Sequence, residues 1–373
     1  MTSIGGAEMV DWNLAVATAT RLVRPGPEVS RDEARAVVAE LRRHAKASEQ
    51  HVRGFTRMGT DDIHDTPILV VDRPGWVRAN VAGFREILKP LLDKMQERRG
   101  NTPGGAVFGA VGGKVTGVEL GMLLSFLSSR VLGQYETFAP ASRELPAGAK
   151  GGRLLLVAPN IVHVERELDV QPHDFRLWVC LHEETHRTQF TAVPWLRDHL
   201  EGEIQSFLGE TEVDPMTVLE RIREAAQSLA GGRPEGEEDD EGRSLVEIVQ
   251  TPAQREILGR LTAVMSLLEG HADFVMDGVG PDVVPSVAEI REKFQQRRAK
   301  GASRLDSALR KLLGLDAKLR QYRDGERFVR AVVEQVGMDG FNRVWTSPNT
   351  LPTKTEIAKP ADWVARVHRK AES

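Results

Sequence analysis

The residues most suited to chemistry are His182, Glu183 and His186, which form the one H-E-x-x-H sequence of the chain. On an α-helix, side chains four residues apart leave the same face, so both imidazoles reach one metal ion while Glu183 points about 100° away. A catalytic zinc ion takes three protein ligands and keeps one position for water, whose proton a nearby carboxylate accepts. The spacing therefore predicts a Zn²⁺ site with Glu183 as its general base.

A surface helix that carries two polar histidines by chance is the plainer interpretation of the same pattern. Trp178, Leu181 and Phe190 flank the motif on several sides of the predicted helix, which is typical of a buried segment. Because burying two imidazoles without a partner is costly, these flanks favour a metal site. Cys180, the lone cysteine, lies about 200° from His182 and is predicted to pack in the core rather than to bind the metal.

The third ligand is predicted on a second helix, because residues 261–277 carry apolar side chains at helical spacing. Within this segment, Glu269 and Asp273 are four residues apart and share a face. Glu269 is the expected third metal ligand, and Asp273 is expected to hydrogen-bond a ligand imidazole from behind. Gly270 is expected to let this helix pack closely against the helix of the H-E-x-x-H motif.

Further residues compete for roles at this site. His271 is the alternative third ligand, but it points about 200° away from Glu269, so one helix does not readily present both to one ion. Its other candidate role is contact with the substrate or with the oxyanion of the transition state. Tyr322 and Arg320 are candidate oxyanion donors, with ordinary helix packing as the alternative, and Tyr135 is a further candidate.

The pattern of the whole chain predicts a mainly α-helical protein with a small β-sheet, an α+β fold class, in which the H-E-x-x-H helix packs against the second ligand-bearing helix. Short apolar runs at residues 68–71 and 153–160 are the strand candidates. The second run is expected either at the edge of the sheet, where an extended substrate backbone could pair with it, or as a buried strand without such a role.

The chain is expected to divide into an N-terminal helical region, residues 1–150, and a metal-binding region, residues 151–373, unless both form one continuous domain. Residues 231–243 are rich in Gly, Asp and Glu. Such a composition cannot bury enough apolar surface to fold, so this stretch is predicted to be a disordered acidic loop.

Composition excludes several classes of partner. The 373 residues carry a formal net charge of −4, which gives no electrostatic basis for binding nucleic acid or an acidic membrane surface. No apolar run is long enough to span a bilayer. The first twelve residues lack the basic and apolar segments of a signal peptide, and a single cysteine suits a reducing compartment, so we expect a cytoplasmic location.

The H-E-E-T-H sequence and the distant E-x-x-x-D of Glu269 and Asp273 resemble the gluzincin arrangement. Longer segments resemble an actinobacterial zincin-like family labelled as hydrolase or zinc-dependent metalloprotease, some members of which carry a label that links them to deazaflavin coenzyme biosynthesis. This resemblance implies a zincin-like core, a Zn²⁺ cofactor on His182, His186 and Glu269, and Glu183 as base. It runs from about residue 11 to residue 367 and is carried by residues 71–76, 131–135, 157–161, 174–178, 268–273 and 314–322.

Together these features predict a zinc-dependent hydrolase, in the first place a peptidase, that acts on a peptide or small amide substrate. The alternative from another class is a binding or scaffold protein with a degenerate core, whose metal site, where there is one, is closed by four protein ligands. A zinc hydrolase of a small non-peptide substrate is the third candidate.

Overall fold

The computed structural model describes residues 9–59, 66–100, 105–138, 152–210, 252–299 and 315–369 of the chain. The predicted acidic loop at residues 231–243 lies outside these ranges. The side chains of Arg320 and Tyr322 also lie outside the described part of the chain, so their predicted roles stay predictions.

The described chain is mostly helical with one small sheet, which confirms the predicted fold class. The sheet consists of β1 (Ile68–Val71), β2 (Gly133–Glu136) and β3 (Arg153–Val157). The helices are α1 (Trp12–Leu22), α2 (Arg31–Thr56), α3 (Arg73–Gly100), α4 (Gly105–Ser128), α5 (Ala158–Leu168), α6 (Pro172–Ala192), α7 (Pro194–Gly209), α10 (Pro252–Gly278), α11 (Val287–Ala299), α13 (Leu315–Phe341), α14 (Lys354–Ala358) and α15 (Pro360–Arg369), with short 3-10 turns at Asn342–Trp345 and Pro348–Thr350.

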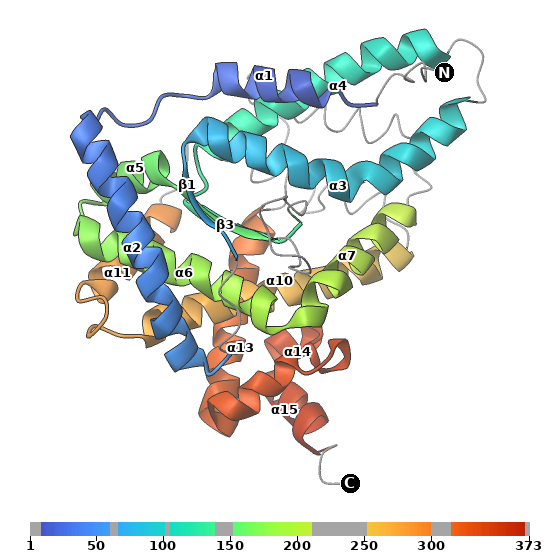
Figure 1. Ribbon diagram of the computed structural model, residues 1–373. Helices are drawn as coiled ribbons and strands as arrows, with labels where there is room; N and C mark the ends of the chain where they lie inside the picture. The colour runs from blue at the N-terminus through green and yellow to red at the C-terminus, as the bar shows by residue number, and fades with distance from the viewer. Residues whose placement is uncertain are drawn as a thin grey trace, which may run out of the picture.

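The elements form three neighbouring layers around the sheet (Figure 1). Helices α1, α3 and α4 lie at one end and share an apolar cluster with β3. Helix α6 crosses the middle, where it packs against α2 on one side and α10 on the other. Helices α7, α10, α13, α14 and α15 form the second large cluster toward the C-terminal end. The middle layer therefore holds α6 between elements that are distant in sequence.

The central strand of the sheet is β3. The strand order is β1-β3-β2, with β1 parallel and β2 antiparallel to β3. The prediction of an edge strand at residues 153–160 is therefore wrong, and the buried alternative is correct; the strand also ends at Val157, where α5 begins. Residues 154–157 are fully buried, and an apolar run without alternation is what a strand covered on both faces requires.

Helix α6 begins at a proline and is buried around most of its circumference. Pro172 suits the first turn because its missing N–H would have no partner there. Asp174, in the same turn, accepts hydrogen bonds from the backbone N–H and the hydroxyl of Ser286, which fixes the start of the helix to the segment before α11. Phe175 and Cys180 are fully buried in the core, as predicted for the cysteine. Burial on opposite sides leaves α6 little freedom to rotate.

Helix α10 makes its closest approach to α13, not to α6. A Cβ atom added to Gly270 would overlap the backbone of Gly325 and Glu326, and one added to Gly325 would overlap Ser266. The prediction that Gly270 lets α10 pack closely against α6 is thus wrong. Adjacent helical residues point about 100° apart, so the turn that aims Glu269 at α6 aims Gly270 at a different neighbour.

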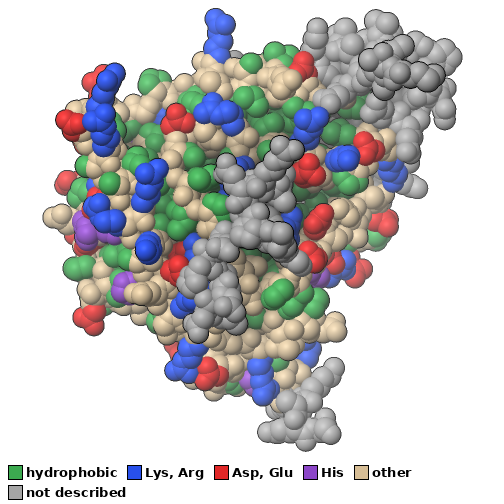
Figure 2. Space-filling view, in the orientation of Figure 1, with side chains coloured by type: hydrophobic (Ala, Val, Ile, Leu, Met, Phe, Trp, Pro, Cys, Tyr) green, Lys and Arg blue, Asp and Glu red, His purple; other side chains and the backbone are tan. Residues whose placement is uncertain are grey.

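Two further features of the fold are the distribution of charge on its surface and the polarity of its helices. Lys and Arg side chains lie among Asp and Glu side chains over much of the face that Figure 2 shows. Among the helices that the structure describes, none has the length and apolar character needed to cross a lipid bilayer.

Replacing Gly270 with Ala should destabilise the protein by about 2 kcal/mol or more, because α10 and α13 must move apart to admit the methyl group. Gly259 on the same helix is the matched control: a Cβ there meets nothing within 4 Å, so Gly259→Ala should raise stability by up to about 1 kcal/mol through helix propensity. Urea unfolding of both variants measures the difference. Equal stability of Gly270→Ala and the wild type would contradict the close packing of these helices.

Candidate metal centre

The two motif histidines face one another on α6 as the i and i+4 spacing requires. Their Nε2 atoms are 3.3 Å apart and their rings are perpendicular. Glu269 reaches the same place from α10: its Oε2 lies 3.9 Å from Nε2 of His182 and its Oε1 lies 3.8 Å from Nε2 of His186. The three ligand atoms all lie within 4.8 Å of one another, so two helices that are far apart in sequence bring two imidazoles and one carboxylate together.

This donor set fits a zinc ion. Two nitrogen ligands at about 2.05 Å in tetrahedral geometry are separated by roughly 3.3 Å, which matches the distance between the two Nε2 atoms. Two imidazole nitrogens that face each other need a proton or a cation between them, and the carboxylate of Glu269 favours positive charge at the same point. All three side chains are partly buried and still reach solvent, so a ligand from outside can approach.

Asp273 lies beside the other nitrogen of His182. Its Oδ1 is 3.8 Å from Nδ1, which is within range of an ion pair but too long for a hydrogen bond. Asp273 follows Glu269 by one turn of α10, so both carboxylates face α6 as their spacing predicts. The predicted supporting role of Asp273 stays a prediction.

The residue that orients His186 is Gln189, which the sequence analysis did not single out. Its Oε1 lies 3.0 Å from Nδ1 of His186, so the amide accepts the Nδ1 proton and leaves the Nε2 lone pair facing the site. Its Nε2 group donates to the carbonyl oxygen of Leu268 at 2.9 Å and lies 3.0 Å from Nδ1 of His271. The three contacts use the acceptor and both donor hydrogens of the fully buried amide. The sequence signal for Gln189 is its position three residues after His186, because side chains at that spacing are neighbours on a helix.

His271 lies behind this amide and outside the donor set. Its ring is fully buried between Phe341 and Trp345, with ring centroids 5.3 and 5.4 Å away. Burial, and then the nearby His186, lower the pKa of His271 to about 3, so the ring is neutral at neutral pH. The structure thus places Glu269, and not His271, beside the two motif histidines. A fully buried ring also cannot touch a substrate in this conformation.

Glu183, the predicted base, is buried between α6 and the sheet. A Cβ atom at Gly133 of β2 would lie 2.5 Å from Cγ of Glu183, so only glycine lets the strand come this close to the carboxylate. Burial, and then the negative charge of Glu269, raise the pKa of Glu183 well above its usual value. The carboxyl group therefore holds a proton more readily than an exposed glutamate.

Tyr135, the weaker oxyanion candidate, lies on the same face of β2 as Gly133. Its ring stacks on Phe190 of α6 with centroids 5.6 Å apart. Burial raises the pKa of Tyr135, although the nearby Arg187 acts in the opposite direction. These contacts give the ring a packing role between the sheet and the C-terminal half of α6.

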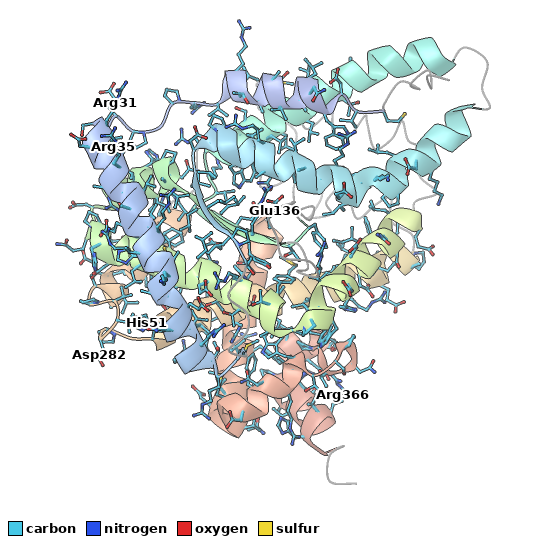
Figure 3. The ribbon with its side chains drawn as sticks, in the orientation of Figure 1. Arg31, Arg35, His51, Glu136, Asp282 and Arg366 are labelled. Carbon is cyan, nitrogen blue, oxygen red and sulfur yellow. The ribbon has the colours of Figure 1, made fainter. Side chains whose placement is uncertain are left out.

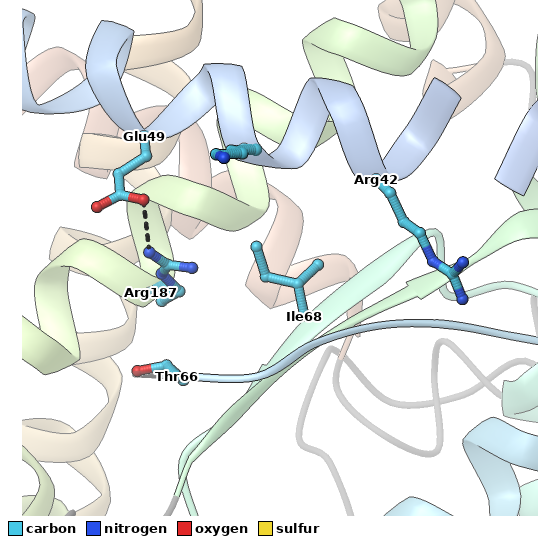
Figure 4. Close-up of a pocket in the computed structure, with 6 residues that line it drawn as sticks. Arg42, Glu49, Thr66, Ile68 and Arg187 are labelled. Atoms are coloured by element: carbon cyan, nitrogen blue, oxygen red, sulfur yellow. Dashed lines mark ion pairs between the residues drawn. The ribbon is translucent and has the colours of Figure 1, made fainter. Parts of the chain in front are cut away.

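The side of α6 that faces α2 carries a separate network of charges. Arg187 pairs with Glu49 of α2 at 3.1 Å, as Figure 4 shows, and with Glu184 at 3.3 Å. Burial raises the pKa of Glu184 to about 8, and Arg187 only partly offsets this. A cavity of about 560 Å³ lies beside this network, lined by Arg42, Lys46, Glu49, Thr66, Ile68 and Arg187. None of these is a predicted site residue, so the cavity is not the metal centre.

Replacing Gln189 with Leu should weaken zinc binding about 10- to 100-fold, because His186 loses the acceptor that fixes its tautomer and ring orientation. The control is Gln205→Leu on α7, whose side chain is exposed and bonds only to Glu201 among the described residues. Competition with a chromophoric chelator at constant pH measures both affinities. Unchanged affinity in the Gln189 variant would rule out the orienting role.

Comparison with known proteins agrees with this geometry. A protein of Chloroflexus aurantiacus, whose crystal structure was described as that of a "putative hydrolase with a novel fold", is 30% identical and superposes with a TM-score of 0.67. The match covers 96% of this chain and 99% of that one. No curated protein matches. The actinobacterial origin and the link to deazaflavin coenzyme biosynthesis stay predictions.

A family model described as zincin-like metallopeptidase matches residues 10–364, nearly the whole chain, including both helices of the metal centre. The family implies zinc binding, and the donor set of His182, His186 and Glu269 has the composition that zinc requires. The chain therefore belongs to the zincin-like metallopeptidase family.

Proposed function

We propose that the protein is a zinc-dependent peptidase that hydrolyses amide bonds with water. The observation that carries the proposal is the convergence of His182 and His186 from α6 with Glu269 from α10. The buried Glu183 directly follows His182 on α6. Membership of a metallopeptidase family and likeness to a structure described as a hydrolase support the same reaction class.

The proposed ligands are Nε2 of His182, Nε2 of His186 and the carboxylate of Glu269. A bound zinc ion supplies a Lewis acid that polarises a carbonyl oxygen and lowers the pKa of water. Among the described residues the group contains three donors, whereas a structural zinc site is closed by four. This count favours a hydrolase over the alternative of a binding or scaffold protein with a closed site.

Glu183 is the proposed general base. A buried carboxylate next to the metal ligands accepts the proton of the attacking water and then gives it to the leaving amine. A raised pKa makes the ionised carboxylate a stronger acceptor for the proton of the attacking water. The positive charge of a zinc ion on the neighbouring ligands would favour this ionised form before the attack. Gly133 keeps the carboxylate between β2 and α6, which limits the positions it can occupy.

Strand β2 supports a peptide as the substrate. In the described part of the sheet β2 pairs with β3 alone, so no described strand pairs with its other edge. Gly133 and Tyr135 face α6, while Gln134 contacts Trp76 of α3 on the opposite face. An extended peptide added to this edge would lie beside Glu183, which is the strand-addition mode of peptide recognition. A small non-peptide amide would make no use of such an edge.

Replacing Glu183 with Gln should leave zinc binding intact and lower turnover about 10²- to 10⁴-fold, because the amide cannot accept a proton. Glu184→Gln is the matched control: the neighbouring carboxyl group is buried with a pKa of about 8, so at pH 7 it is already mostly neutral and the variant should retain activity. Cleavage of a broad peptide library, followed by mass spectrometry, together with metal analysis, checks both variants. If the Glu183 variant cleaved peptides at the wild-type rate, the mechanism would be wrong.

A further inference from the structure

A second group of metal-binding side chains lies at the other end of α6. Glu40, His44 and His173 each offer one ligand atom, and these atoms all lie within 4.8 Å of one another. The group consists of two imidazoles and one carboxylate, the same donor types as the proposed catalytic site. His173 precedes His182 by nine residues, which corresponds to roughly 13 Å along the helix axis, so the two groups are separate.

The three donors come from two helices that pack against each other. Glu40 and His44 are one turn apart on α2 and share a face, and His173 lies in the first turn of α6. Nδ1 of His173 lies 2.8 Å from Oε1 of Glu40, and Nε2 of His44 lies 3.4 Å from the same oxygen. The two rings meet edge to face with centroids 4.6 Å apart. One carboxylate oxygen is thus shared by two imidazoles.

The other oxygen of Glu40, Oε2, binds an arginine and not a histidine. Arg176 of α6 donates to Oε2 of Glu40 and also binds Glu165 of α5, with Nη2 to Oε1 at 2.5 Å and Nε to Oε2 at 2.9 Å. The guanidinium therefore fixes the orientation of Glu40 and leaves Oε1 directed at the two rings. Outer contacts of this kind orient the ligands of metal sites.

His44 provides an independent indication of a ligand. The residue is 7% exposed, and its buried Nε2 lies 3.4 Å from Oε1 of Glu40 without forming a hydrogen bond of good geometry to any described residue. A buried polar atom without a partner is unfavourable and calls for an explanation such as an ion. His173, by contrast, has a side chain that is 67% exposed. One donor is therefore inside the protein and another at its surface, which gives an ion from solvent access to the group.

We propose that Glu40, His44 and His173 form a second metal site that ties α2 to the first turn of α6. Imidazole with one carboxylate suits zinc and similar transition-metal ions, whereas calcium and magnesium take oxygen ligands alone. The ion would replace the single hydrogen bond between His173 and Glu40 with three bonds across the helix pair. Because α6 also carries His182 and His186, this site would add a further anchor at the N-terminal end of the helix of the catalytic site.

The test counts bound metal after the catalytic site has been removed. Metal-free protein carrying His182→Ala and His186→Ala should still bind one equivalent of Zn²⁺ at micromolar concentration, and the ion should raise its melting temperature. Adding His173→Ala should abolish both effects. This third substitution is at an exposed position, so the variant should fold, and its far-ultraviolet circular dichroism spectrum should match that of the double variant.

His51→Ala is the matched control, because His51 is an exposed histidine further along α2 (Figure 3). In the same double-variant background it should leave the bound equivalent and the melting temperature unchanged. The proposal is overturned if the folded double variant binds no zinc, binds it only at millimolar concentration, or keeps its equivalent after His173→Ala. The otherwise wild-type chain with His173→Ala should bind one equivalent fewer while the proposed catalytic site keeps its own, so the two sites can fail separately.

Discussion

The meeting of α6 and α10 is the constraint on which the rest of the structure depends. It places two imidazoles and a carboxylate within a few ångströms of one another inside an apolar helical fold. Such a group is unfavourable by itself, because partly buried polar atoms need partners. A divalent cation supplies a common partner for all three. The surrounding helices can be understood as the packing that keeps this crossing in place.

Three devices position the crossing. On one side, α2 and α5 cover the N-terminal half of α6 and share an apolar cluster with it. On the other, the backbone contact at Gly270 and Gly325 joins α10 to α13, so α10 cannot slide along α6 without breaking it. Between them, Gln189 of α6 contacts His186 of its own helix and both the carbonyl group of Leu268 and the ring of His271 on α10. This one side chain therefore joins the two helices. Helix packing thus sets the position of the ligands, whereas the hydrogen bond to Gln189 sets the tautomer of His186.

Features that repeat at short spacing could be predicted from the sequence. The i and i+4 spacing of His182 and His186 and the apolar periodicity around Glu269 indicated two helices with the right faces, and the structure brings those faces together. The strand predicted at residues 153–160 is present as Arg153–Val157, because a short leucine-rich run after loop residues is a strong local signal. Within one helix or strand, the geometry of the backbone determines which residues share a face.

Features that depend on the choice of neighbour could not be predicted in this way. Helical spacing shows that Gly270 faces away from Glu269 but does not show which helix lies there. An apolar run likewise does not distinguish a central strand from an edge strand, so both places in the sheet stayed open for β3 until the strand order was known. The group of Glu40, His44 and His173 joins helices whose sequences are more than a hundred residues apart, and its E-x-x-x-H spacing on α2 has meaning only once His173 is placed beside it.

The most direct test of the central claim is a crystal structure of the zinc-loaded protein with anomalous diffraction measured on both sides of the zinc absorption edge. The account predicts an anomalous peak bound by Nε2 of His182, Nε2 of His186 and the carboxylate of Glu269, with a remaining position that no protein atom fills. A peak absent from this position, or one with a fourth protein ligand that closes the coordination shell, would contradict it.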